Sequence, residues 1–286
     1  MRAPAAEVEQ MADVPATDIR YREQQLARFR VSVLKQAKWR ELSRAAGDTR
    51  GKRALDLGTD NGVISWLFRQ QGGEWSSADL TAHAANAISR TLGERAIELS
   101  DARLPWPDAS FDVIVVADML EHVADDRALL VEIARCLTVG GRAVLNVPRL
   151  KPLGMLHPVR RALGLTNEWH GHLRGGYDAA SLRALLPATL RLCETREYVR
   201  FFSFALDTAL NAGSGRAKPG TTVRTAKGTI PAASGRDAKP EGAAVKVMYP
   251  FMRAFAALDA LLPFTHGYML VATLERTPGA RDVTES

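Results

Sequence analysis

Acidic residues stand at the ends of four successive apolar segments in the first half of the chain, where they could bind a ligand. Asp56 lies in the string Ala-Leu-Asp-Leu-Gly-Thr-Asp-Asn-Gly of residues 54–62, and Asp79, Asp101 and Asp118 follow later segments. A carboxylate is poorly suited to phosphate but pairs readily with an ammonium or sulfonium cation. Glycines in the first segment let the backbone approach a ligand without a Cβ in the way. The pattern predicts a site for a ligand that carries a cationic group.

The spacing of the second acid suggests a ribose contact. Asp79 lies 21 residues beyond Gly58, where α/β nucleotide sites place a carboxylate on ribose hydroxyls. The complete GxGxxG of dinucleotide enzymes is absent, which disfavours an NAD-dependent dehydrogenase. Structural alternatives remain open, because Gly58 and Gly62 could serve only tight packing at a turn and Asp79 could cap a helix.

The elements that must position these residues alternate between strands and helices. Apolar runs predict strands at residues 52–57, 74–80, 96–99, 111–117, 142–147, 191–200 and 268–274. Helical spacing of apolar residues predicts helices at residues 17–46, 61–71, 82–92, 125–137, 152–164, 178–186, 201–210 and 247–262. The run Phe-Asp-Val-Ile-Val-Val-Ala at 111–117 suggests a strand buried on both faces. We therefore predict an α/β, doubly wound parallel sheet with ligands at the carboxyl ends of its strands.

The charge of the chain is concentrated in one segment. The formal net charge is +6, and residues 212–246 hold seven basic and two acidic residues, so +5 of it lies there. The same segment has six glycines, three prolines and no aromatic residue. Such a segment buries too little apolar area to offset its ordering entropy. We interpret it as a flexible basic insertion in an almost neutral protein, which weakens the nucleic-acid interpretation that a pI near 9.5 invites.

Cysteine usage and apolar segments bear on the cellular setting. Cys136 and Cys193 are far apart and outside any CxxC, so neither a disulfide framework nor a cysteine zinc site is expected. We find no apolar stretch of transmembrane length and no signal-peptide core. These features predict a cytoplasmic protein.

Four ordered motifs resemble those of one enzyme class. LDLGTDNG, SADL, DARLPWPDASFDVIVVADMLEHV and LLVEIARCLTVGGRAVLNVP, within residues 50–150, are similar to the successive motifs of class I S-adenosylmethionine-dependent methyltransferases. The resemblance is to the type 11 small-molecule group. It implies a seven-stranded Rossmann-like sheet in the order 3-2-1-4-5-7-6 with the last strand antiparallel, and S-adenosyl-L-methionine as cofactor.

The resemblance also implies which residues contact the cofactor. Asp79 would bind the ribose hydroxyls with Leu80 on the adenine, and Asp101 would accept from the adenine amino group with Ala102 beside it. Asp118 would line the methionine end and the mouth of the substrate site. The implied cofactor-binding residues are Asp56, Gly58, Thr59, Gly62, Asp79, Leu80, Asp101, Ala102 and Asp118. The family usually has a glycine where Asp60 stands.

Methyl transfer demands little chemistry from the protein. The sulfonium methyl group is already activated, and a base is needed only if the acceptor keeps its proton until attack. His122, four residues after Asp118, is the candidate catalytic base, although a hydrogen-bonded structural histidine is an equal alternative.

A polar segment at residues 169–177 could contact the acceptor. The family often has an HxRxGY-like sequence here, which implies substrate-binding roles for His170, His172, Arg174 and Tyr177. A loop held by its own hydrogen bonds is the alternative. Although His170 and His172 suggest a metal, we found no carboxylate or cysteine to complete a ligand set, so we predict none.

Absent motifs narrow the acceptor. The resemblance implies a small molecule or a lipid- or sugar-linked intermediate, because the Asn/Asp-Pro-Pro motif of amino-group methylation and the Pro-Cys of cytosine methylation are missing. No DNA partner is expected. RNA methylation aided by the basic insertion and a non-catalytic cofactor-binding module of the same fold are the alternatives. Oligomeric state and acceptor atom stay open.

The chain organisation follows from these segments. We expect an N-terminal helical extension at 1–48, a cofactor-binding core at 49–211 with a substrate loop at 150–177, and the insertion at 212–246. A helix and final strand at 247–276 would complete the core before a disordered tail at 277–286. The apolar helix at 247–262 packs on the sheet in our preferred interpretation, and the alternative is a lid or a peripheral membrane contact.

Overall fold

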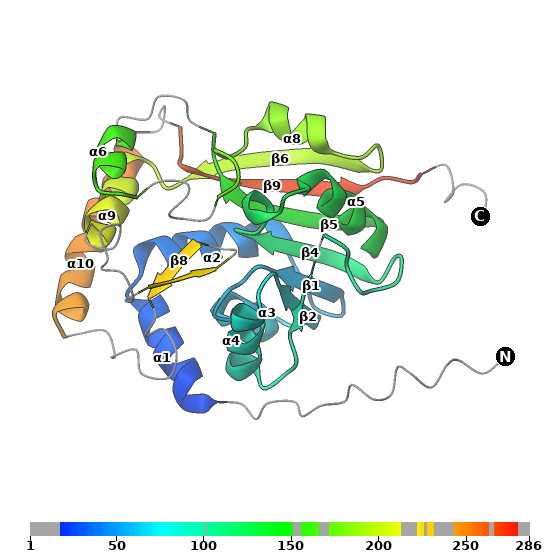
Figure 1. Ribbon diagram of the computed structural model, residues 1–286, viewed down its shortest axis with the longest axis horizontal. Helices are drawn as coiled ribbons and strands as arrows, with labels where there is room; N and C mark the ends of the chain where they lie inside the picture. The colour runs from blue at the N-terminus through cyan, green and yellow to red at the C-terminus, as the bar shows by residue number, and fades with distance from the viewer. Residues whose placement is uncertain are drawn as a thin grey trace.

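The central feature of the computed structural model is one mixed sheet, with strands in the order β3-β2-β1-β4-β5-β9-β6 (Figure 1). The structure describes residues 18–100, 102–150, 156–165, 172–212, 222–225, 228–231, 243–262 and 266–279. The strands of this sheet are β1 (Arg53–Leu57), β2 (Glu74–Asp79), β3 (Ile97–Glu98), β4 (Phe111–Ala117), β5 (Leu137–Pro148), β6 (Leu190–Tyr198) and β9 (Met269–Arg276).

The direction of the strands confirms the predicted fold class. Strands β1 to β5 pair in parallel, whereas β9 is antiparallel to both β5 and β6. Counted within the sheet, the order is 3-2-1-4-5-7-6 with an antiparallel last strand. Each parallel pair requires a crossover, and the crossovers place helices on both faces.

The helices flank this sheet (Figure 1). They are α1 (Ile19–Arg30), α2 (Val33–Ala46), α3 (Val63–Gln71), α4 (Ala82–Leu92), α5 (Asp126–Cys136), α6 (His157–Ala162), α8 (Ala179–Leu185), α9 (Phe201–Asn211) and α10 (Ala243–Ala257). Short 3-10 turns are η2 (Leu120–His122) and η5 (Leu258–Leu261). None of the described helices is long and apolar enough to cross a membrane.

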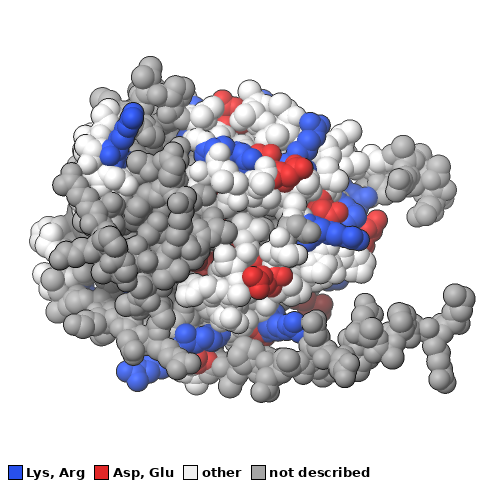
Figure 2. Space-filling model, in the orientation of Figure 1, with Lys and Arg blue, Asp and Glu red and all other residues white. Residues whose placement is uncertain are grey.

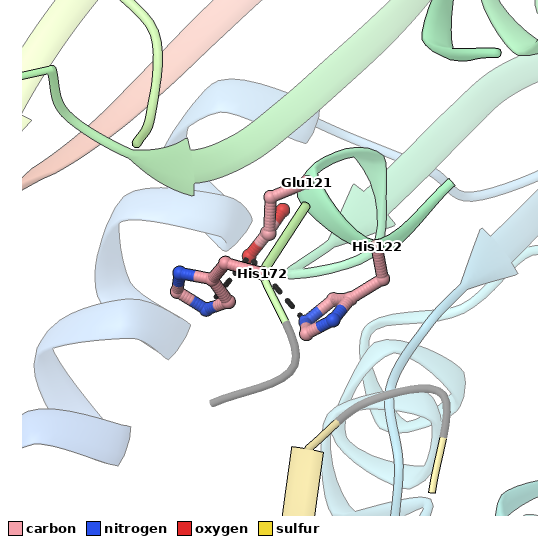
Figure 3. Close-up of side chains that lie close together, drawn as sticks. All are labelled: Glu121, His122 and His172. Atoms are coloured by element: carbon pink, nitrogen blue, oxygen red, sulfur yellow. Dashed lines mark ion pairs between the residues drawn. The ribbon is translucent and has the colours of Figure 1, made fainter. Parts of the chain in front are cut away.

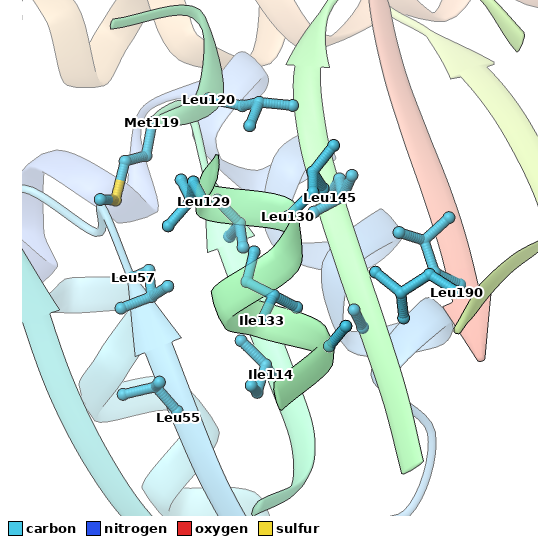
Figure 4. Close-up of a cluster of buried hydrophobic side chains, with 14 of the residues drawn as sticks. Leu55, Leu57, Ile114, Met119, Leu120, Leu129, Leu130, Ile133, Leu145 and Leu190 are labelled. Atoms are coloured by element: carbon cyan, nitrogen blue, oxygen red, sulfur yellow. The ribbon is translucent and has the colours of Figure 1, made fainter. Parts of the chain in front are cut away.

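The alternation of side chains along the strands divides the core into two layers. Leu55 and Leu57 of β1 pack with Ile114 of β4 and Leu129 of α5 on one face, as Figure 4 shows. Ala54 lies in the layer on the opposite face, together with side chains of α2 and α3. Successive side chains of a strand point to opposite faces, so a run that is apolar throughout is buried on both.

The structure differs from the sequence prediction in the N-terminal helix, in the insertion and at the start of α10. Residues 17–46 form two helices instead of one, because Ser32 has extended backbone angles and its Oγ accepts a hydrogen bond from the backbone N–H of Lys35, which caps α2. Within the predicted flexible insertion, β7 (Thr222–Thr225) and β8 (Gly228–Pro231) pair as an antiparallel hairpin. Local composition did not indicate this pairing, and α10 begins at Ala243, before the predicted end of the insertion.

Charged side chains are mixed on the described surface. On the face seen in Figure 2, Lys and Arg side chains lie beside Asp and Glu side chains. Arg135, for example, pairs with Glu132 at 2.7 Å and with Asp108 at 2.8 Å. The described part of this face therefore presents alternating charge, in keeping with an almost neutral body.

Candidate active site

A cavity of about 670 Å³ opens at the carboxyl ends of β1, β4 and β5. The loop after β1 contributes Gly58, Thr59, Asp60 and Asn61 to its lining, and Asp118 follows β4. Parallel strands end at the same edge of a sheet, so the loops after them converge there. The cavity lies where the strand pattern places a ligand.

Both glycines of the first loop are required by packing. Gly58 has φ +83°, and a Cβ there would lie 2.5 Å from the carbonyl oxygen of Ala117. Gly62 has φ +77°, and its Cβ would lie 2.9 Å from the Cα of Ile88. The tight-packing alternative therefore holds for both, and Gly58 in addition lines the cavity.

Asp60 adopts the conformation that suits a glycine. Its φ is +65°, in the left-handed region, where Asp and Asn are tolerated better than other non-glycine residues. Its backbone N–H donates to the Asp79 carboxylate at 3.2 Å, and the residue lines the cavity. The departure from the family's glycine thus keeps the turn and adds a carboxylate to the site.

Asp56 does not face the cavity, which corrects our expectation. Its side chain is fully buried and accepts hydrogen bonds from Ser65 Oγ at 2.6 Å and Ser77 Oγ at 2.7 Å. It also accepts from Thr59 Oγ1, and Arg69 lies 3.3 Å away as its ion-pair partner. Asp56 sits inside β1, paired on both sides by β2 and β4, so its side chain points to a sheet face, towards α3.

Asp79, the carboxylate predicted to bind the ribose, is also fully buried. Its side chain accepts from the backbone N–H groups of Leu80 at 2.7 Å and Asp60. Leu80 and Ala102 pack against the hydrophobic layer under α5 rather than lining the cavity. Asp101 lies outside the described residues. Asp79 therefore holds the turn at Asp60 and does not line the cavity itself.

Asp118 anchors a polar network from four elements. Lys38 of α2 forms an ion pair with its carboxylate, and Asn146 of β5 donates to the same group. Tyr198 of β6 donates to Asn146 Oδ1 at 2.6 Å. Burial alone would lower the pKa of Lys38, but the adjacent Asp118 carboxylate raises it, so the ammonium stays charged. Burial first, and then the charge of Asp118, raises the pKa of Tyr198 well above 10, so it stays a neutral donor.

Helices α1 and α2 form one wall of the cavity, which the sequence did not reveal. Tyr21, Gln25 and Lys38 from these helices line it, and Asn61 donates to Gln25 Oε1 at 3.1 Å. The contribution of Lys38 depends on an ion pair across 80 residues of chain. Helical spacing of apolar residues predicts the helix at residues 17–46 but does not indicate that Lys38 pairs with Asp118. The sequence therefore predicts only an N-terminal helical extension.

Glu121, His122 and His172 converge on the cavity (Figure 3). Glu121 Oε1 lies 3.9 Å from His122 Nε2 and 4.0 Å from His172 Nε2. The Glu121 residue is only 1% exposed. The two imidazole rings meet edge to face, with centroids 5.1 Å apart. His122 and His172 therefore lie where a proton from a bound acceptor could be taken.

Arg174 and Tyr177 hold the loop that carries His172. Arg174 donates to the carbonyl oxygens of Leu120, Val123 and Ala124 at 2.8–3.1 Å. Tyr177 is buried and donates to Asp126 Oδ2 at 2.9 Å. Neither residue is among those that line the cavity, and their hydrogen bonds favour the alternative, a loop fixed by its own contacts. His170 lies outside the described residues.

The match to a known family covers the residues around this cavity. Residues 55–145 match the family described as "Methyltransferase domain". Together with the strand order, this match over about a third of the chain supports the resemblance to class I S-adenosylmethionine-dependent methyltransferases. The recognition made from the sequence, and the cofactor that it implied, agree with this match.

Two relatives are methyltransferases by name, and one solved structure shares the fold. The chain is 30% identical over 120 residues to a demethylmenaquinone methyltransferase of Tropheryma whipplei (strain Twist), covering 40% of this chain and 50% of that protein. It is 24% identical over 182 residues to a ubiquinone biosynthesis O-methyltransferase of Bordetella avium (strain 197N), covering 58% and 75%. The crystal structure of the 4+2 cyclase SpnF superposes with a TM-score of 0.56 at 16% identity, covering 94% and 100%.

The chain spans about half the length of the first of these relatives. The resemblance to the cyclase, at 16% identity, shows the fold alone.

Proposed function

We propose that this chain is an S-adenosylmethionine-dependent methyltransferase that methylates a hydroxyl group on a small, largely apolar acceptor. The observation that carries the proposal is one cavity, lined by Gly58 and Asp118 as well as by His122 and His172. Its volume of about 670 Å³ falls in the usual range of about 300–1,000 Å³ for small-molecule sites.

The residues at the methionine end suit this cofactor. Asp118 lines the cavity with a partly exposed carboxylate, which can pair with the ammonium group of the cofactor. The bound cofactor supplies a methyl group that its sulfonium already activates. Near the expected ribose, Asp60 is the carboxylate that lines the cavity. The buried Asp79 carboxylate positions Asp60 by accepting a hydrogen bond from its backbone N–H. We assign Asp56, Thr59 and Gly62 to the support of this loop.

The chain's own contribution to the reaction is orientation and proton removal. Holding two reactants in line can lower a barrier by about 7–11 kcal/mol. A hydroxyl acceptor must also lose its proton, and a neutral imidazole is the side chain best matched to that task near pH 7. We assign this role to His122, with His172 beside it.

Aromatic rings in the cavity wall and exposed apolar side chains on the helix next to α9 support an acceptor with an aromatic or prenyl body. Phe204 and Tyr268 line the cavity and stack with centroids 3.6 Å apart. Beyond α9, large apolar side chains are exposed on α10 and η5, namely Val247, Met248, Phe251, Phe255, Leu258 and Leu261. The two relatives named above are quinone-pathway methyltransferases by name. We therefore propose a quinol-like acceptor, which in its lipid-linked form would run its tail along this surface.

Cofactor binding and turnover test the proposal in two steps. Calorimetry should show binding of S-adenosylmethionine and S-adenosylhomocysteine, and Asp118→Asn should weaken it about tenfold or more, because a charged hydrogen bond is lost. Asp108→Asn, at an exposed ion pair on the surface, is the matched control. A demethylated quinol should then yield S-adenosylhomocysteine. If neither cofactor form binds at millimolar concentration, the proposal fails.

The same assays separate the two alternatives. A non-catalytic cofactor-binding module would bind both cofactor forms and turn over no acceptor. An RNA methyltransferase would bind RNA with strong salt dependence and lose that binding when residues 213–245 are deleted.

A further inference from the structure

We propose that Glu121, His122 and His172 form a binding site for one divalent transition-metal ion of the zinc type. One ligand atom from each of the three side chains lies within 4.8 Å of the other two. All three residues line the cavity of the candidate active site. Two imidazoles and one carboxylate form a ligand set of catalytic zinc sites, and the same set with open positions serves other first-row ions.

The distances fit an ion after a small adjustment. Neighbouring ligands on an ion with bonds of about 2.1 Å are about 3.0–3.5 Å apart in octahedral or tetrahedral geometry. The carboxylate oxygen Oε1 of Glu121 is 3.9 Å from one imidazole nitrogen and 4.0 Å from the other. Each side chain therefore needs to move by less than about 1 Å. Imidazole ligands select a transition metal over Mg²⁺, which prefers oxygen.

The backbone around the cluster is held in place. Glu121 and His122 belong to η2, and the backbone N–H of Leu173 donates to the carbonyl oxygen of Glu121 at 2.9 Å. Arg174 fastens the same loop to the carbonyl oxygens of Leu120 and Val123. The loop that brings His172 is thus fixed to the turn that carries the other two ligands, as a preorganised metal site requires.

The charges of the neighbourhood are compatible with a bound cation. The Glu121 carboxylate is buried, and a charge at that depth needs a compensating charge. The adjacent ion pair of Lys38 and Asp118 has no net charge. A divalent ion would make the cluster +1. With the ion bound, His122 would be a ligand and no longer the base, so an acceptor hydroxyl on the ion would give its proton to solvent, and the resulting oxygen would bring the sum to zero. This role of the ion rests on the proposed function, whereas the site itself does not.

Direct metal binding tests the site without any activity measurement. Chelator-treated protein should bind one equivalent of Zn²⁺ by calorimetry, and Co²⁺ should give visible absorption bands typical of protein-bound cobalt. His172→Ala removes a ligand and Glu121→Gln removes the charge of one, so each should weaken Zn²⁺ binding by more than the roughly 10–100-fold that loss of an outer-shell partner costs. His83→Ala is the matched control, because His83 is exposed and lines the same cavity outside the cluster.

A folding control and two results decide whether the metal site is correct. Circular dichroism and thermal unfolding verify that His172→Ala is folded, so that its loss of metal reports on the ligand. If the wild-type chain binds no Zn²⁺ below about 100 μM, or if His172→Ala binds it as tightly as the wild type, the metal site is wrong. Cofactor binding measured on the same samples separates the two proposals: a chain that binds S-adenosylmethionine but no metal refutes only the metal site.

Discussion

Replacing Asp56 distinguishes a structural carboxylate from one that binds ligand. Asp56→Asn keeps the shape of the side chain and removes its charge. In the structure this carboxylate is fully buried, with Ser65, Ser77 and Arg69 as partners. Breaking a buried ion pair costs about 3–5 kcal/mol. Arg69 keeps an ion pair with Glu94 at 2.9 Å, so we expect the lower end, about 3 kcal/mol of unfolding free energy.

Urea unfolding, followed by circular dichroism, measures this loss. With an m value of about 3 kcal/mol per M, the midpoint should fall by about 1 M. Asp48→Asn, in an exposed pair with Arg50, should shift it little. Calorimetry on folded Asp56→Asn should give a cofactor affinity within about threefold of the wild type. A variant with unchanged stability and much weaker cofactor binding would contradict the structural role and restore the ligand contact that the sequence suggested.

The remaining predictions concern the turn at Asp60, the ion pair of Lys38 and Asp118, and the cap of α8. Asp60→Gly should change stability by less than about 1 kcal/mol, whereas Asp60→Val should cost about 2 kcal/mol, since a β-branched residue is strained at φ +65°; urea midpoints of the two variants check this. In a double-mutant cycle, the effects of Lys38→Met and Asp118→Asn on the unfolding free energy should be non-additive by about 1–3 kcal/mol. Additive effects would show that the two side chains do not interact. Asp178 caps α8, and backbone hydrogen bonding at Ser181 lowers its pKa below 3.8. The stabilisation it adds is therefore present above about pH 4 and lost as the pH falls through the lower folded value. Asp178→Ala should be about 1 kcal/mol less stable than the wild type at pH 7, with the gap closing on acidification; a gap independent of pH would refute this cause.

Apolar patterning was enough to predict where most strands and helices lie along the chain. The run at 111–117 became β4 with the predicted bounds, and the helix at 82–92 became α4 with the predicted bounds. Both depend on local rules: uninterrupted β-branched residues for a strand buried on both faces, and a threonine cap with a terminal glycine for the helix. The sequence does not indicate the break between α1 and α2 at Ser32, because the helical spacing of apolar residues continues on both sides of this one capping serine.

The candidate site was predicted only in part. Gly58, Thr59, Asp118, His122 and His172 line the cavity, and their contacts with cofactor and acceptor stay predictions. No metal is predicted from the sequence, because no carboxylate or cysteine was found to complete a ligand set with His170 and His172. Glu121 stood beside His122 in the sequence throughout, but nothing local indicated that the loop after β5 would bring His172 to it.

The sequence by itself determined where the strands and helices lie along the chain and at which edge of the sheet the loops meet, because hydrophobic period and glycine turns are local properties. The order of the strands within the sheet was implied only by the resemblance to class I methyltransferases. Only the tertiary structure decided which carboxylates face the cavity. Asp56 lies within β1, where side-chain alternation turns it towards α3, whereas Asp118 lies one residue past β4, free of that alternation. Tertiary packing also brought Lys38 to Asp118 and His172 to Glu121. Such contacts join residues 80 and 51 positions apart, and no local pattern encodes them.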